Sequence, residues 1–259
     1  MNVKISVIIT TYHQKAFTLN CVKSYLYFCP DNIKLNLIVV ENSNDQTYKK
    51  DVLELGNNII WINNNTDYRG ANANANGVEV GMKYVGEEYV FLSHNDVCIT
   101  SSMFYNCMAK KIEEGNRLIG TCYDVHPLRH HSIIILGCMV DPKIVRAVDL
   151  YPENRPDGTP HFECGDRIHI YCKDNNIKHV CLKNTHNNKE ILTNMQELYR
   201  SIPYTLRTID DEGNVIFMHF SRGTPKTNNQ YIKRGRWSIP QIMNFCEENI
   251  YLRKNNELV

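Results

Sequence analysis

The sequence predicts an α/β fold with a Rossmann-like, mostly parallel sheet. Four short apolar runs, rich in β-branched residues and each ending in polar residues, alternate with helical patterns. The connections between them are short, so a parallel sheet with right-handed crossovers is expected. These strands are predicted at residues 4–10, 35–40, 58–62 and 89–93. No G-x-G-x-x-G follows the first strand, so the fingerprint of dinucleotide binding is absent.

Composition narrows the class of protein. The chain has 259 residues, enough for one large domain with an appendage, and its formal net charge of +1 argues against broad adhesion to nucleic acid. No apolar run is long enough to span a bilayer, and the N-terminus lacks a charged-then-apolar leader. The ten cysteines form no C-x-x-C pair and mostly lie in apolar runs, as reduced thiols do. We therefore expect a cytoplasmic protein without a transmembrane segment.

Helical patterns separate the strands of the first half. The first lies between residues 17 and 28 and ends at Pro30, and a shorter one is expected at residues 46–55. Residues 70–77 (GANANANG) lead into a third helix that begins near Asn72. Its small residues would let the backbone approach the sheet or a ligand.

The second half continues the α/β pattern and then changes. Strands are expected at residues 118–122, 132–136, 178–182 and 214–220, and helices at residues 102–114, 142–148, 166–174 and 238–252. Ser238 is a suitable N-cap for the last helix, with Pro240 in its first turn. No clear linker is present. We expect residues 1–188 to form the main domain and residues 189–259 a partly helical C-terminal extension packed on it.

Polar side chains follow the predicted strand at residues 89–93. His94, Asn95 and Asp96 come directly after it, and ligands of open α/β sheets bind at the carboxyl ends of the strands. A hard divalent cation that bridges phosphates prefers carboxylate oxygens, which Asp96 offers. The triplet therefore predicts a metal and phosphate site, with an ordinary polar turn as the alternative.

Four segments carry a resemblance to a known family. They are residues 5–12 (ISVIITTY), residues 39–45 (VVENSND), residues 70–77 (GANANANG) followed by the HND triplet, and residues 137–139 (GCM) followed by 163–166 (ECGD). In this order they resemble the family 2 glycosyltransferases of the GT-A fold over about residues 3–187. The family has Pro at Thr10, Asp at Glu41 and an acidic residue at His94, and its usual base falls on Cys164 if Glu163 opens the E-D-x-D segment.

The resemblance implies transfer of a sugar, with inversion, from a nucleoside-diphosphate donor to a hydroxyl acceptor. A UDP-sugar is the expected donor, and Mn²⁺ or Mg²⁺ the expected cofactor. The residues expected to contact the nucleotide are Thr10, Thr11, Tyr12, Glu41, Asp67, Arg69, Asn74 and Asn95. For Glu41, capping of a turn or helix is the alternative, and for Arg69 simple solvation.

Asp96 is the expected metal ligand. His94 would ligate the metal, contact the sugar or pack on the turn, and His is a better ligand for Mn²⁺ than for Mg²⁺. The family often adds a late His. His186, just past the last sheet strand, fits this role best, and His219 is the second choice.

A carboxylate near the acceptor is needed to take up the hydroxyl proton. Glu163 and Asp166 are the candidates, with Asp166 the first choice because a shift of frame places it at the family's base position. Acidic capping of a helix start is the structural alternative.

Other functions and partners remain open at this point. A nucleotidyltransferase shares the layout, but residues 10–14 lack its Gly-rich basic loop. A catalytically silent GT-A-like protein that binds nucleotide sugars or glycans would explain His94 and Cys164. The acceptor is a glycan, a lipid-linked compound or another hydroxyl compound. Residues 233–237 (KRGRW) could contact anionic lipid, a phosphorylated glycan or nucleic acid, or form a solvated turn, so peripheral membrane attachment stays open.

Overall fold

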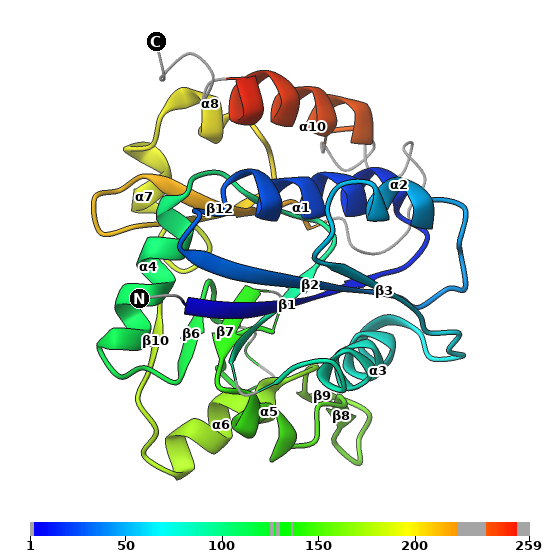
Figure 1. Cartoon of the computed structure of the whole chain (residues 1–259). Coiled ribbons are helices and arrows are strands. Elements are labelled where there is room, and N and C mark those ends of the chain that lie inside the picture. The colour runs from blue at the N-terminus through cyan, green and yellow to red at the C-terminus, as the bar shows by residue number, and fades with distance from the viewer. Residues whose placement is uncertain are drawn as a thin grey trace.

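The computed structural model describes residues 3–86, 88–124, 127, 130–135, 137–221 and 237–252. A seven-stranded mixed sheet forms its centre (Figure 1). In spatial order its strands are β10 (His179–Cys181), β6 (Leu118–Gly120), β7 (Gly137–Val140), β4 (Tyr89–His94), β1 (Val3–Thr11), β2 (Ile33–Glu41) and β3 (Ile59–Asn63). Neighbours are parallel except that β7 runs antiparallel to both β4 and β6. The predicted α/β fold with a mostly parallel sheet is confirmed.

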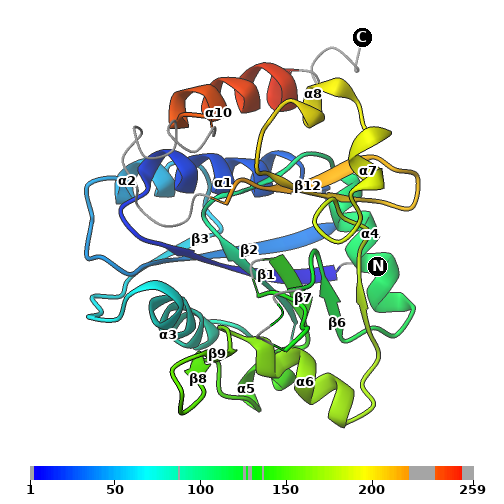
Figure 2. The same ribbon diagram turned by 180° about the vertical axis from the view of Figure 1, so that it is seen from behind.

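Helices cover both faces of this sheet (Figures 1 and 2). One face carries α1 (Lys15–Tyr27) and α4 (Met103–Glu113), with α10 (Ile239–Cys246) packed on the outer side of α1, and the other face carries α3 (Gly70–Met82), α5 (Pro142–Arg146) and α6 (Asp166–Asp174). The short helices are α2 (Lys49–Leu53), α7 (Glu190–Thr193) and α8 (Glu197–Arg200). Along β1, Val7 and Ile9 join the core under α1, while Ile8 joins the core under α3. Burial on both faces explains why these strands read as continuous apolar runs.

Small residues let α3 lie close to the sheet. A Cβ atom added at Gly77 would lie 2.9 Å from the Thr10 Cγ2, and one at Gly81 would lie 2.8 Å from the Ile8 Cγ2. Of the two alternatives from the sequence, the small residues thus serve the approach to the sheet, and α3 begins at Gly70 rather than near Asn72.

A second sheet joins the C-terminal segment to the end of β4. Its order is β11 (Leu206–Ile209), β12 (Val215–His219) and β5 (Val97–Ile99), and all pairs are antiparallel. A separate hairpin consists of β8 (Glu153–Asn154) and β9 (Pro160–Phe162). In the C-terminal segment the sequence predicted only the strand that forms β12. It missed β11 in that segment and β5 after β4. Both are three or four residues long, and polar Arg207 and Thr208 interrupt the apolar pattern of β11.

The strand predicted at residues 132–136 is wrong. Among the described residues of this stretch, only Ile133 makes a bridge, to Tyr123, and the strand begins at Gly137 as β7. Ile133 instead packs over Gly120, which has no Cβ atom and leaves room for its side chain.

The last helix begins as predicted. The Ser238 hydroxyl accepts from the Gln241 N–H, and the Gln241 side chain accepts from the Ser238 N–H, which forms a capping box. Beyond α10 the chain continues as a π-helical turn, Glu247–Tyr251, rather than as regular α-helix. The basic residues 233–236 lie outside the described part of the chain.

Candidate active site

Three potential metal ligands meet at the carboxyl end of β4. β4 ends at His94, and Asp96 follows two residues later in the turn before β5. β12 pairs with β5 so that His219 lies opposite Val97, and the His219 Nε2 is 3.2 Å from the Asp96 Oδ1. One ligand atom from each of His94, Asp96 and His219 can be chosen so that all three lie within 4.8 Å of one another.

Hydrogen bonds from α1, β4 and the residue after β12 fix the turn that carries His94 and Asp96. The carbonyl oxygen of His94 accepts from the Cys21 thiol at 3.4 Å and from the Ser93 hydroxyl at 3.0 Å. The Tyr25 hydroxyl in turn donates to the Ser93 hydroxyl at 3.0 Å. On the other side, the Phe220 N–H donates to the Asp96 carbonyl oxygen at 2.9 Å. Both elements that supply ligands are thus fixed by backbone contacts, so the trio is preorganised.

Burial sets the electrostatics of the trio. The Asp96 side chain is only 1% exposed, and a buried carboxylate is unfavourable unless a cation or donor compensates its charge. Burial also lowers the pKa of His94 to about 4, because it disfavours the imidazolium more than the nearby Asp96 carboxylate favours it. At neutral pH His94 is therefore the neutral imidazole, which is the form that binds metals.

The donor set fits a transition metal ion. Two imidazole nitrogens and one carboxylate oxygen suit Mn²⁺ or Zn²⁺, whereas Mg²⁺ prefers an all-oxygen octahedral shell. Of the two ions expected from the sequence, the trio fits Mn²⁺ better.

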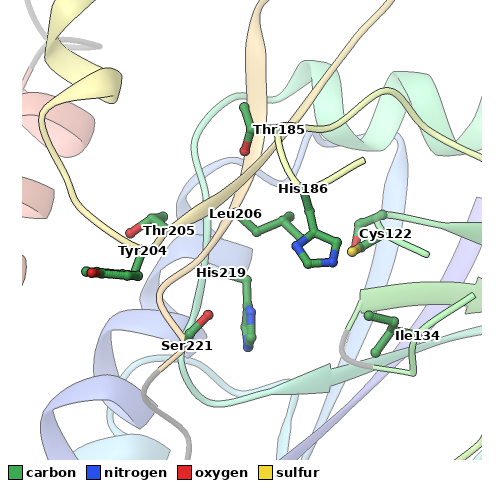
Figure 3. Close-up of a pocket in the computed structure, with 10 residues that line it drawn as sticks. Cys122, Ile134, Thr185, His186, Tyr204, Thr205, Leu206, His219 and Ser221 are labelled. Atoms are coloured by element: carbon green, nitrogen blue, oxygen red, sulfur yellow. The ribbon is translucent and has the colours of Figure 1, made fainter. Parts of the chain in front are cut away.

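A cavity of about 450 Å³ lies beside the trio, with His219 in its wall. Its described lining residues are Thr121, Cys122, Ile134, Thr185, His186, Tyr204, Thr205, Leu206, His219 and Ser221. Figure 3 shows the imidazoles of His186 and His219 within this wall. His186 thus lies in the cavity with His219, while the trio contains His219, the second choice from the sequence.

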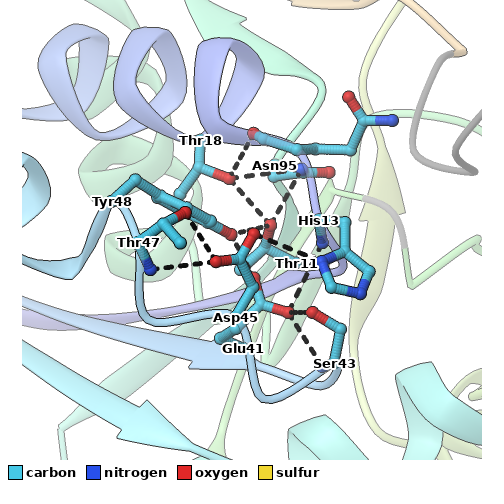
Figure 4. A network of polar contacts seen from close by, with 10 residues as sticks. Thr11, His13, Thr18, Glu41, Ser43, Asp45, Thr47, Tyr48 and Asn95 are labelled. Atoms are coloured by element: carbon cyan, nitrogen blue, oxygen red, sulfur yellow. Dashed lines mark hydrogen bonds and ion pairs between the residues drawn. The ribbon is translucent and has the colours of Figure 1, made fainter.

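Several residues expected to contact the nucleotide form a buried network instead of an open surface (Figure 4). The Glu41 carboxylate is 0% exposed and accepts from the Ser43 N–H at 2.8 Å and from the Tyr48 hydroxyl. The Asn95 side-chain amide donates to the Thr11 hydroxyl at 3.0 Å. Since their polar groups are already engaged, these side chains fix the strand ends, which is the capping role left open for Glu41.

Other expected nucleotide residues lie at the surface or under α3. The Arg69 guanidinium is 5.6 Å from the centroid of the Tyr12 ring, and both Arg69 and Asp67 are exposed. The Thr10 hydroxyl donates to the Asn74 side-chain oxygen at 3.4 Å, at the contact between β1 and α3. Of the predicted set, Asp67 and Arg69 are exposed, Tyr12 and Asn74 are partly buried, and the other four are buried.

The acidic turn at the start of α6 is hydrogen-bonded to the segment that carries the cavity residue Ile134. Asp166 is 2% exposed, and its two carboxylate oxygens accept from the Ser132 hydroxyl and from the Glu163 N–H, the latter at 2.7 Å. Burial raises the pKa of Asp166 above its ordinary value. Glu163 is only partly buried, and Ile134, two residues after Ser132, lines the cavity.

Cys164, at the family's usual base position, does not offer a base. The side chain is buried, and burial raises the pKa of its thiol well above the ordinary value. Residues that sequence reasoning missed include Ser132, Tyr204 and Arg207. No local motif marks them: the Ser132 hydroxyl acts on Asp166, 34 residues away, and Tyr204 and Arg207 lie in a stretch without apolar periodicity.

Comparisons with known proteins give structural matches alone. No protein-family model matches the sequence, and no curated protein does. Mannosyltransferase PcManGT from Pyrobaculum calidifontis, in complex with GDP-Man and Mn²⁺, is 12% identical with a TM-score of 0.43, and the match covers 55% of this chain and 46% of that one. Glucosyl-3-phosphoglycerate synthase from Mycobacterium tuberculosis is 11% identical with a TM-score of 0.49, covering 69% and 70%.

4-Diphosphocytidyl-2C-methyl-D-erythritol synthase from Anaerococcus prevotii is 14% identical with a TM-score of 0.46, covering 70% of this chain and 90% of that one. This chain spans about half of the length of the mannosyltransferase. Because these TM-scores are below 0.5, the proposed function rests on the geometry of the site itself. In the described part of the chain, no helix is long and apolar enough to cross a membrane.

Proposed function

We propose that this chain is a metal-dependent glycosyltransferase that moves a sugar, with inversion, from a nucleoside-diphosphate donor to a hydroxyl acceptor, and that the donor is a UDP-sugar. The observation that carries the proposal is the trio of His94, Asp96 and His219 beside a cavity at the carboxyl edge of the sheet. Ligands of open α/β sheets bind at this edge.

The sheet order supports a division of the site. β1 and β2, which end in Thr11 and Glu41, lie on one side of β4. Thr121 and Cys122, which follow β6 and line the cavity, lie on the other side. The nucleoside would lie over the ends of β1 and β2, the diphosphate at the trio and the reacting sugar towards the cavity.

Each group in this arrangement has a defined task. A divalent ion held by His94, Asp96 and His219 would neutralise the charge that develops on the departing diphosphate. The Tyr12 ring offers a stacking face for the base, and the Arg69 guanidinium offers donors suited to phosphate oxygens.

The acceptor oxygen attacks the anomeric carbon while the bond from that carbon to the diphosphate oxygen breaks, and a carboxylate takes the hydroxyl proton. The sequence favours Asp166 as this base, but the geometry favours Glu163. Both oxygens of Asp166 already accept hydrogen bonds, one of them from the Glu163 N–H, so Asp166 orients the turn that carries Glu163. We therefore assign the base to Glu163 and a positioning role to Asp166.

The proposal is tested by nucleotide release. The purified protein is incubated with UDP-glucose, UDP-galactose, UDP-N-acetylglucosamine and GDP-mannose, with Mn²⁺ or with EDTA, and free nucleoside diphosphate is measured. We expect UDP to be released from one of the UDP-sugars, and only when Mn²⁺ is present. Release should be slow without an acceptor, as the donor is hydrolysed, and faster when glycosides are added. Metal-dependent nucleotide binding without release would favour the catalytically silent alternative. Pyrophosphate release from a nucleoside triphosphate would favour a nucleotidyltransferase.

A further inference from the structure

We infer that the cavity beside His219 is the acceptor subsite and that it takes an uncharged sugar ring. The inference rests on the proposed function, which assigns the nucleotide to the other side of β4. The cavity volume of about 450 Å³ falls within the roughly 300–1,000 Å³ typical of small-molecule sites. Its wall is built mainly by the C-terminal half of the chain, including the segment between β10 and β12.

The chemistry of the wall matches a hydroxylated ring with an apolar face. Hydroxyl groups come from Thr121, Thr185, Tyr204, Thr205 and Ser221, and apolar surface comes from Ile134 and Leu206. Hydroxyls both donate and accept hydrogen bonds, so they suit sugar hydroxyls, while the apolar side chains suit the C–H face of a ring.

Charge complementarity argues for an uncharged acceptor. None of the ten described lining residues is Lys, Arg, Asp or Glu, whereas phosphate groups are bound by guanidinium or ammonium groups. Arg207 is the buried cation of the adjoining strand, but its guanidinium is occupied within the protein. It donates to the carbonyl oxygens of Tyr199, Ile202 and Thr205.

Those three hydrogen bonds preorganise the wall. They tie residues 199–205 to β11 and so fix Tyr204, which has a φ of +55° and is 63% exposed. A non-glycine residue with positive φ is strained, and such strain is tolerated where the surroundings hold it and the side chain has a use. An aromatic ring presented at the rim of a cavity can stack on a sugar ring.

The part of the wall that carries Thr185 and His186 is also held by hydrogen bonds. The Arg207 N–H donates to the Thr185 hydroxyl at 3.0 Å, and the Thr185 N–H donates to the Arg207 carbonyl oxygen at 2.9 Å. The Asn184 side-chain oxygen accepts from the His186 N–H at 3.0 Å. This turn holds Thr185 and His186 at the cavity next to His219, so hydroxyl and imidazole groups face a ring bound there.

Saturation-transfer NMR with defined sugars tests the inference. The probes are methyl glycosides of glucose, galactose, mannose and N-acetylglucosamine, each compared with glucose 6-phosphate and mannose 6-phosphate, in the presence of UDP and Mn²⁺. We expect at least one glycoside to bind and the phosphorylated sugars not to bind. Tyr204→Ala is expected to weaken glycoside binding about three- to tenfold, as loss of one aromatic contact does, and Tyr204→Phe to retain it.

Tyr84→Ala is the matched control, because Tyr84 is also an exposed tyrosine (50%) but lies with Lys4 at the opposite edge of the sheet. Tighter binding of the phosphorylated sugars, no binding of any glycoside, or equal glycoside binding by Tyr204→Ala would overturn the inference. UDP titrations of the same samples separate the two proposals. Glycoside binding without UDP binding would refute the transferase and leave a glycan-binding cavity.

Discussion

Replacing Asp96 by asparagine is expected to lower kcat about 100- to 1,000-fold and to remove binding of Mn²⁺. The amide has nearly the same shape as the carboxylate but no charge, so the cation loses its anionic ligand in a site where Asp96 is 1% exposed. Metal ions stabilise developing charge by several kcal/mol, and each ~1.4 kcal/mol corresponds to tenfold in rate.

The measurement combines steady-state nucleotide release with titration of Mn²⁺ followed by its EPR signal. Asp211→Asn is the control, since this exposed carboxylate pairs with Lys110 and lies in the turn between β11 and β12, at the end of β12 opposite His219. Thermal melts check that the Asp96→Asn protein is folded. An Asp96→Asn protein that binds Mn²⁺ and turns over like wild type would refute the metal role.

Glu163→Gln is expected to reduce kcat by about 10²- to 10⁴-fold, the usual contribution of a general base, while UDP affinity stays unchanged. The glutamine cannot take up a proton at neutral pH, but it leaves the backbone N–H of residue 163 free to donate to Asp166. The readouts are single-turnover rates with Mn²⁺ and the Kd of UDP.

Asp166→Asn separates the base from its positioning residue. Burial raises the pKa of the Asp166 carboxyl, so the folded protein favours its protonated form and ionisation of this group lowers the free energy of unfolding. The stability that the protonated carboxyl contributes is fully present below the ordinary pKa of 3.8 and is lost as the pH rises through the raised pKa. Removing the carboxylate should flatten this part of the stability curve and alter kcat less than Glu163→Gln does. Full activity of Glu163→Gln, together with an inactive and stably folded Asp166→Asn, would assign the base to Asp166.

Local pattern was sufficient to predict the sheet and the edge at which His94 and Asp96 lie. Residues 4–10 and 89–93 are continuous apolar runs because helices cover both faces, and this makes β1 and β4 recognisable in sequence. Asp96 follows directly from its place after such a strand. The predicted strand at residues 132–136 failed because apolar composition does not distinguish a strand from an irregular buried segment that fills the space over Gly120.

The choice between the late histidines could not be made from sequence. His186 lies just past a strand and His219 between apolar residues, and only the pairing of β12 with β5 brings His219 to Asp96. β5 has three residues and carries no periodicity of its own. Likewise, burial of Glu41 depends on Tyr48 and Ser43 closing over it, which no motif encodes.

Calorimetric titration of UDP into the protein tests the central claim most directly, because it asks whether the trio of His94, Asp96 and His219 holds a metal ion that receives a diphosphate. Titrations are run with Mn²⁺, with Mg²⁺ and with EDTA. The expected result is binding that is tightest with Mn²⁺, weaker with Mg²⁺ and lost with EDTA, and that is lost with Mn²⁺ in His219→Ala. UDP binding of equal strength in all three conditions, or none in any, would contradict the account.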